Sequence, residues 1–362
     1  MLDDDDLDAA VGTRIVTQAQ ADALRTFAAG RRKTGAAERA DEERFRFMRG
    51  FNDFFFAIGV VLFGAGLSIF AGIHDNPIVF GLAAVTMWGL AELLVRRKRL
   101  VLPGIVVALF FVSFAVSAVP LANLLAAAPN PLLPSAASRL SLLNTFFGNG
   151  SMPVIAIKAV IASAAGALFY ARFRFPFALL LVAGGAVIAL QLAASHFLFN
   201  DSAVARLAIL LLCGVAVFGV AMRFDLSDRL RATRRSDCAF WLHVLAAPML
   251  VHSLVGLVSN NTFRPDTFTA TMIVVIALLL TIVALIIDRR ALLVSALVYV
   301  GSVIAYALSN ATLDRTFILI ATLVILGALV LALGVGWTPL RRRVASVLSL
   351  KLVNRLPPVV PA

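Results

Sequence analysis

The residues best suited to chemistry lie in one stretch, from Arg223 to His252, with the sequence RFDLSDRLRATRRSDCAFWLHVLAAPMLVH. Its second half is an apolar run that carries two histidines and begins close to Asp237. Asp237 precedes His243 by six positions, about 9 Å along a helix that rises about 1.5 Å per residue. Ionisable residues inside membrane-spanning segments mark functional sites by default. Asp237 and His243 are therefore candidate substrate-binding residues.

His252 and Asp53 complete the candidate set. His252 follows His243 by nine positions, about 900° around a helix, so the two rings lie on opposite faces and cannot share one metal ion. Asp53 opens the first apolar run much as Asp237 opens a later one. A membrane enzyme acting on a lipid or polyprenyl substrate would need Asp53, Asp237 and His243 to meet in one pocket. In the alternative interpretation the histidines are packed and hydrogen-bonded, and the aspartates are paired or solvated at helix ends.

The motifs of the common cofactor and metal sites are missing. The sequence contains no Walker or dinucleotide glycine loop, no GxSxG elbow and no HxxxH or ExxH pattern, so we predict neither a cofactor nor a bound metal. Cys213 and Cys238 lie in successive apolar runs, and we expect no disulfide between them. Glu92 precedes Arg96 by four positions, the spacing of an ion pair on a helix surface.

The segments that position these residues have the composition of membrane-spanning helices. Of the 362 residues, 61% are hydrophobic and 14% are charged, whereas a soluble domain is about 45–50% apolar and about 25% charged. Apolar runs of this length are typical of transmembrane helices. The runs are apolar all round, unlike the alternating strands of a β-barrel. The predicted fold class is all-α, a polytopic transmembrane helical bundle.

Ten spans can be placed on the sequence. They cover residues 51–73, 77–95, 100–123, 153–171, 176–195, 204–222, 238–258, 267–287, 291–309 and 315–336. Together they form one transmembrane domain, residues 51–336. A cytoplasmic N-terminal helix and basic linker, residues 1–50, precede it, and a cytoplasmic amphipathic tail, residues 337–362, follows it.

The basic residues sort onto one side of these spans. With the N-terminus inside, 27 of the 32 lysines and arginines fall in inner loops and tails, and four (Arg139, Arg206, Arg264 and Arg315) fall outside. Such asymmetry predicts an N-in, C-in topology in a bacterial inner membrane. The net charge of +12 is thus assigned to topology and to anionic lipid at the cytoplasmic face, and nucleic acid is not an expected partner.

Both ends of the chain carry helix signals. Thr17 and Gln20 fit a capping box, which predicts a short helix from Thr17 to about Ala29 that docks on the membrane domain. The acidic start, MLDDDD, does not resemble a cleavable signal peptide, so the first span is expected to act as an uncleaved insertion signal.

The last segment, Thr338 to Arg355, is expected to form an amphipathic helix at the membrane surface, with Thr338 as its cap and Pro339 in its first turn. Arg341–Arg343 on this helix would meet anionic lipid. The alternative is a poorly ordered basic tail.

Two parts of the chain are alike. The residues that open spans one and seven are similar, RGFNDFFF and RSDCAFW, and acidic and basic residues precede both span three and span nine. These similarities would relate spans 1–3 to spans 7–9 as parallel repeats, as in some transporters. Similar topology alone also produces such likeness.

The TQAQADAL helix ahead of a multi-span domain, together with the late GWTPLRRRV segment, resembles uncharacterised bacterial inner-membrane proteins of unknown function. The resemblance implies location and architecture, and no functional residue. Three functions stay open: a permease-like bundle that moves or holds an apolar or lipid-like substrate, a scaffold that recruits a cytoplasmic protein partner, and the membrane enzyme described above. The mostly uncharged interior of the spans favours the first.

Overall fold

The structure is a computed structural model that describes residues 4–13, 15–27, 51–74, 76–120, 152–197, 202–229, 231, 233–259, 266–309 and 314–347. Within these ranges every regular element is a helix, and no strand occurs. The predicted all-helical fold class is therefore confirmed.

Each of the ten predicted spans contains a helix. These are α3 (Phe51–His74), α4 (Pro77–Ala91) with its π-helical continuation η1 (Glu92–Arg97), α5 (Leu102–Ser117), α8 (Met152–Phe173), α9 (Phe177–Phe197), α10 (Ala203–Ser227), α11 (Arg234–Val258), α12 (Thr267–Ile287), α13 (Ala291–Ser309) and α14 (Arg315–Val347). Among the described residues, eight helices are long and apolar enough to cross a membrane, whereas α5 and residues 295–309 of α13 are shorter apolar helices. The chain therefore has the helices of a multi-pass membrane protein, and ten crossings stay a prediction.

Several of these helices begin next to a residue whose side chain caps the first turn. The Asn76 side chain accepts a hydrogen bond from the Ile78 amide, directly before Pro77 at the first position of α4. The Asp266 carboxylate accepts the Thr269 amide at 2.8 Å and caps α12 in the same way.

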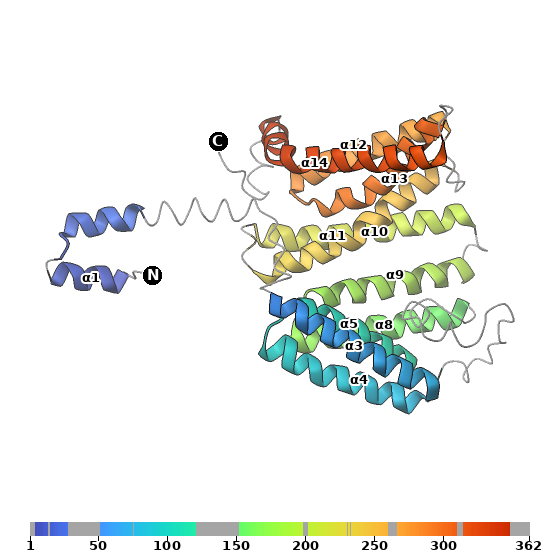
Figure 1. Cartoon of the computed structure of the whole chain (residues 1–362), viewed down its shortest axis with the longest axis horizontal. Coiled ribbons are helices and arrows are strands. Elements are labelled where there is room, and N and C mark those ends of the chain that lie inside the picture. The colour runs from blue at the N-terminus through green and yellow to red at the C-terminus, as the bar shows by residue number, and fades with distance from the viewer. Residues whose placement is uncertain are drawn as a thin grey trace.

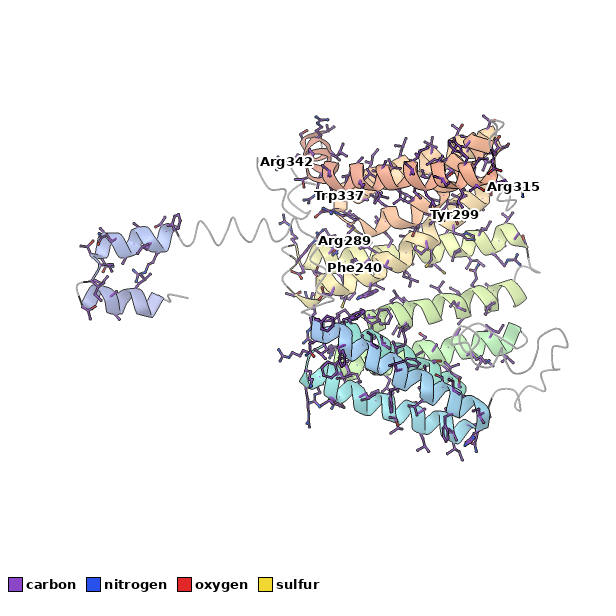
Figure 2. The ribbon with its side chains drawn as sticks, in the orientation of Figure 1. Phe240, Arg289, Tyr299, Arg315, Trp337 and Arg342 are labelled. Atoms are coloured by element: carbon purple, nitrogen blue, oxygen red, sulfur yellow. The ribbon has the colours of Figure 1, made fainter. Side chains whose placement is uncertain are left out.

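The helices lie side by side and are shown in Figure 1. At one side α5 packs against α3, α4 and α8; α9 joins α8 to the pair α10 and α11, and α12, α13 and α14 form the other side. Figure 2 shows Arg289 and Arg342 at one end of this bundle and Arg315 at the opposite end. We call the end that holds Arg289 and Arg342 the basic end.

Loops at the basic end contain an uncommon backbone conformation. In the described part of the chain four residues other than glycine have a left-handed φ, namely Arg99, Arg174, Arg231 and Asp288, with φ between 50° and 56°. Glycine is the usual residue at such helix ends because it has no Cβ. Here three of the four positions hold arginine, whose backbone is less favourable in this conformation than that of glycine.

Aromatic side chains form the core between α4, α5 and α8. The Trp88 ring lies 5.3 Å from Phe111 and 5.0 Å from Phe173, and Phe169 lies 5.7 Å from Phe111. Phe169 is fully buried. A second, smaller core around Trp337 joins α12, α13 and α14.

The two predicted repeats have the same packing pattern. In the first, α5 packs against both α3 and α4; in the second, α13 packs against both α11 and α12. The two third helices differ in length, since α5 has 16 residues and α13 has 19. A left-handed residue precedes each of them, Arg99 in one case and Asp288 in the other. That these two triplets are true repeats stays a prediction.

The N-terminal capping box is confirmed. The Thr17 amide donates to Gln20 Oε1 at 2.9 Å, and the Gln20 amide donates to Thr17 Oγ1 at 3.3 Å. Helix follows over residues 18–27, and the predicted end near Ala29 lies outside the described residues. A further helix, α1 (Asp4–Gly12), was not expected from this acidic segment. Docking of this region on the membrane domain stays a prediction.

The C-terminal prediction is wrong in one respect. Thr338 does not cap a separate helix, because α14 continues from Arg315 to Val347 with Pro339 inside it. Figure 1 shows the last turns of α14 turned out of line with the rest, the effect that proline has where it removes a backbone hydrogen bond. Arg341, expected to meet lipid, is buried instead. Residues beyond Val347 lie outside the described part.

Span three ends earlier than predicted. Span three was predicted to reach residue 123, but α5 ends at Ser117, with Ala118 as its C-cap. Of the small residues at helix faces, Gly166 meets α9 closely, since an added Cβ would lie 3.2 Å from the Val182 amide. Close packing of small residues is how apolar helices approach one another in a membrane.

Candidate functional site

A cluster of charged side chains lies buried at the basic end, and Asp225 is at its centre. Val217, Ala221 and Asp225 follow one another at intervals of four along α10, and all three are buried. The apolar face of α10 thus continues for one more turn into a carboxylate. The Asp225 side chain is only 5% exposed, so its charge must be matched by neighbouring groups.

His243 of α11 is the first group that contacts the Asp225 carboxylate. Its Nε2 lies 2.9 Å from Asp225 Oδ2, and the residue is 0% exposed. Phe218 covers the ring in a T-shaped contact with centroids 5.2 Å apart. Within the described ranges no hydrogen-bond partner lies at His243 Nδ1. A neutral imidazole that donates from Nε2 fits this geometry, because it leaves only an acceptor atom unmatched at Nδ1.

Arg289, in the connection between α12 and α13, is the second group that contacts the Asp225 carboxylate. Its Nε donates to Asp225 Oδ2 at 3.1 Å, and its Nη2 donates to Asp225 Oδ1, so the pair is bidentate. Nη2 also donates to the carbonyl oxygen of Ser236 at 3.2 Å and lies 3.3 Å from Ser236 Oγ. Arginine is suited to such a site, because its planar fork holds both carboxylate oxygens. Asp225 therefore links α10, α11 and the α12–α13 connection.

Asp288, one residue earlier, forms a second centre. It caps α12 in the left-handed conformation, with φ 56° and ψ 51°, and the Arg289 amide bonds back to Ala284 O at 2.9 Å. Arg231, from the loop between α10 and α11, donates to Asp288 Oδ2 at 2.8 Å and to the carbonyls of Ile287 and Asp288 at 3.2 Å and 2.7 Å. An arginine that bonds the last carbonyls of a helix also complements the helix dipole.

The α14 helix closes the cluster. Trp337 Nε1 donates to Asp288 Oδ1 at 2.8 Å, and Arg341 Nε lies 3.6 Å from the same oxygen. Arg290 lies over the Trp337 ring at 5.2 Å from its centroid, a cation–π distance. Figure 2 shows Trp337 and Arg289 at the same end of the bundle. We call the whole set, Asp225, Arg231, Ser236, His243, Asp288, Arg289, Trp337 and Arg341, the buried charge network.

The buried charge network joins four helices through hydrogen bonds and ion pairs. Two carboxylates and three guanidinium groups are held away from water, and each carboxylate is bound by residues from other segments of the chain. A buried ion pair gives little net stability compared with apolar side chains of the same shape, but removing one partner is strongly destabilising. The network therefore connects α10, α11, α12 and α14 at the basic end.

The structure separates the sequence-predicted site residues. His243 lies in the network, but its partner is Asp225 of α10 rather than Asp237 of its own helix. Asp53 is buried on α3, which packs against α4 and α5 and is not among the main neighbours of α11. His252 Nδ1 lies 2.7 Å from the Tyr299 hydroxyl of α13. The histidines thus have different partners, as expected for opposite faces.

Sequence reasoning missed Asp225 and the roles of Arg231, Arg289 and Trp337. Asp225 was available from the α10 pattern, since it continues the four-residue spacing of buried positions. No comparable signal marks Arg289 or Arg231, because a basic residue in an inner loop serves topology in most membrane proteins.

Outside the buried charge network, we looked for groups of metal ligands and for other ion pairs. Among the described residues no three His, Cys, Asp or Glu side chains are grouped as metal ligands would be. The predicted Glu92–Arg96 pair forms at 3.2 Å, and Arg172 of α8 joins Glu92 at 2.7 Å.

No family model matches the chain, and no match to it was found among curated proteins or solved structures.

Proposed function

We propose that the chain is a carrier-type membrane protein that moves an apolar or lipid-like substrate, and that the buried charge network closes its cytoplasmic end. The proposal includes ten crossings, both termini in the cytoplasm and a bacterial inner membrane. The observation that carries it is the Asp225–Arg289–His243 contact, which ties three separate segments of the chain in a dry site. Ionisable residues buried in membrane helices are candidate functional residues by default, and substrate pathways are among the sites they mark.

The energetics of the network favour a gate. If stability alone were selected, apolar side chains of similar volume would serve as well as buried ion pairs. A bidentate ion pair, in contrast, has a well-defined made state and a well-defined broken state. A contact with two discrete states is what alternating access requires at the end of a bundle.

The similar packing of two helix triplets supports the same function. In the first triplet α5 packs against α3 and α4, and in the second α13 packs against α11 and α12. Parallel repeats of this kind also fit a carrier in which one half moves relative to the other.

The substrate class follows from the interior. The buried polar side chains of the spans away from the basic end are uncharged hydroxyls, among them Ser113, Ser253 and Thr322, so far as the described residues extend. His252 and Tyr299 satisfy each other at 2.7 Å. Such an interior offers no charge to a hydrophilic solute, and an apolar or lipid-like substrate is the match.

The enzyme alternative has lost its main support. It required Asp53, Asp237 and His243 to meet, but His243 Nε2 is used by Asp225. The scaffold alternative is favoured by the exposed arginines of the basic end, such as Arg342 and Arg343, and it would require no movement of the helices.

The proposal can be tested with purified protein in vesicles of phosphatidylethanolamine and phosphatidylglycerol. The vesicles contain a trace of phospholipid with a fluorescent acyl chain, with an ethanolamine, glycerol or choline headgroup in separate samples. Dithionite added outside destroys only the probe that reaches the outer leaflet. We expect faster and more complete loss of fluorescence than in protein-free vesicles for at least one headgroup.

A matched pair of variants links this activity to the network. Asp225→Leu/Arg289→Met removes both charges together and should leave a folded protein with an apolar contact at the same place. We expect it to lose the flipping activity, whereas Asp22→Asn in the N-terminal region should retain it. If no headgroup moves faster with wild-type protein than without, the transport function is wrong and the scaffold function replaces it.

A further inference from the structure

The π-helical turn at the end of α4 forms a hollow at the basic end. η1 (Glu92–Arg97) has hydrogen bonds that span five residues, as in the 3.0 Å bond from the Lys98 amide to Leu93 O. Beside this wide turn lies a hollow of about 640 Å³, lined by Gly89, Glu92, Leu93, Arg96 and Arg97. π-Helical turns are frequent at functional sites.

The hollow has an apolar part and a cationic part. Gly89 lies in the last turns of α4, whereas Leu93, Arg96 and Arg97 lie in η1. Leu93 is 43% exposed, and nothing lies within 4 Å of a Cβ added at Gly89. Gly89 and Leu93 thus form an apolar floor, and Arg96 and Arg97 bring the guanidinium groups.

The charges of the hollow are unbalanced. Its only carboxylate, Glu92, is held by Arg96 at 3.2 Å and by Arg172 at 2.7 Å. No carboxylate among the described residues pairs with Arg97, whose side chain is exposed. Lys98 is held over the Phe56 ring at 4.5 Å. One acid therefore faces several bases, and the surplus charge is positive.

We infer that this hollow binds an anionic phospholipid of the inner leaflet. The phosphate would contact Arg96 and Arg97, and the first part of an acyl chain would lie over Leu93 and Gly89. Arginine is the preferred partner of phosphate because it donates two parallel hydrogen bonds. A soluble anion would use the arginines but not the apolar floor, so the continuity of the two parts identifies a lipid. The inference does not depend on transport.

Two variants test the two parts of the hollow. Arg96→Gln/Arg97→Gln removes the cationic part, and Gly89→Leu fills the apolar part without touching the core, since the space beside Gly89 is open. Arg234→Gln/Arg235→Gln, at two exposed positions where α11 begins, is the charge control. Gly219→Leu is the steric control, because Gly219 also has nothing within 4 Å of an added Cβ.

The measurement is binding of phosphatidylglycerol to full-length protein in phosphatidylcholine nanodiscs, read by native mass spectrometry. We expect both test variants to lose at least about tenfold in affinity, equivalent to about 1.4 kcal/mol, and both controls to lose less than about twofold. Retained binding in either test variant would overturn the inference.

A second arm separates a lipid from a soluble anion. Inorganic phosphate is added at the same concentration as the lipid, and we expect it not to displace phosphatidylglycerol. If phosphate displaces the lipid equally well, or if Gly89→Leu binds lipid normally while the arginine variant does not, the site is for a soluble anion. Since the assay reads binding alone, its outcome is independent of the flipping assay above.

Discussion

Asp225, the last buried residue of α10, and His243 of α11 share a hydrogen bond of 2.9 Å although eighteen positions separate them in the sequence. The bond fixes the rotation of one helix about its axis relative to the other. It also leaves the second face of the Asp225 carboxylate open to Arg289, which arrives from a loop 64 positions beyond Asp225. The helix pair α10–α11 and the α12–α13 connection therefore meet at a single carboxylate.

Asp225→Asn should destabilise the protein strongly. The amide keeps the shape of the side chain but leaves Arg289 buried without its opposite charge, which typically costs about 3–5 kcal/mol. Asp225→Leu/Arg289→Met should be more stable than Asp225→Asn, because both charges are gone. The free energy of unfolding in detergent decides this, with Asp22→Asn as the exposed control; equal stability of Asp225→Asn and wild type would show that the network opens in the resting protein.

The ten helices could be predicted from the sequence because each follows from a local property, the length and continuity of an apolar run. The capping box at Thr17 and Gln20 could be predicted for the same reason, as its two hydrogen bonds join residues three positions apart. The end of span ten could not. Arg341 lies inside the last helix, 3.6 Å from Asp288, a residue 53 positions earlier, and no local pattern reports that contact.

The candidate site was predicted in part. His243 was found because a histidine in an apolar run is rare, but its partner was sought on its own helix. The partner came from the neighbouring helix, whose rotation depends on the packing of the complete bundle. Arg289 looked like any inner-loop arginine because its bidentate contact is made by tertiary structure alone.

Two adjacent glycines of α9 should respond oppositely to alanine. A Cβ at Gly185 would lie 2.7 Å from Ala159 O and 2.8 Å from the Ser163 amide, both in the backbone of α8, so Gly185→Ala should cost about 1–3 kcal/mol. At Gly184 the nearest atom is Leu245 Cδ1 at 4.0 Å, and Gly184→Ala should be neutral or stabilising, by up to about 1 kcal/mol. Thermal unfolding of both variants makes the comparison, and equal loss would mean that α8 and α9 are not in this close contact.

Trp337→Phe should weaken the attachment of α14. Phenylalanine keeps an aromatic ring beside Arg290 but removes the Nε1 donor that Asp288 accepts at 2.8 Å. Leaving a buried carboxylate oxygen short of a donor costs about 1–3 kcal/mol. The check is a double-mutant cycle on the unfolding free energy with Asp288→Gly, which removes the acceptor and suits the left-handed backbone; the two losses should be less than additive. Additive losses would mean that the hydrogen bond contributes nothing.

The short helix α5 makes the topology testable at a sensitive place. With Cys213 and Cys238 replaced by serine, single cysteines are introduced at Arg97, the last residue of η1 ahead of α5, and at Val119, just beyond the end of α5. If α5 crosses the membrane, an impermeant maleimide should label Val119→Cys from outside intact cells and Arg97→Cys only in inverted vesicles. Labelling of both from the same side would show that α5 enters and leaves on one face.

The same experiment on the last helix, α14, decides the orientation of the C-terminal end. Arg315 and Arg342 lie at opposite ends of α14 (Figure 2), which spans Arg315–Val347. Because inner loops hold most of the arginines, we expect Arg315→Cys to be labelled from outside and Arg342→Cys from inside. The reverse pattern would place the buried charge network on the outer side, and a gate facing the cytoplasm would then be wrong even if the protein moves lipid.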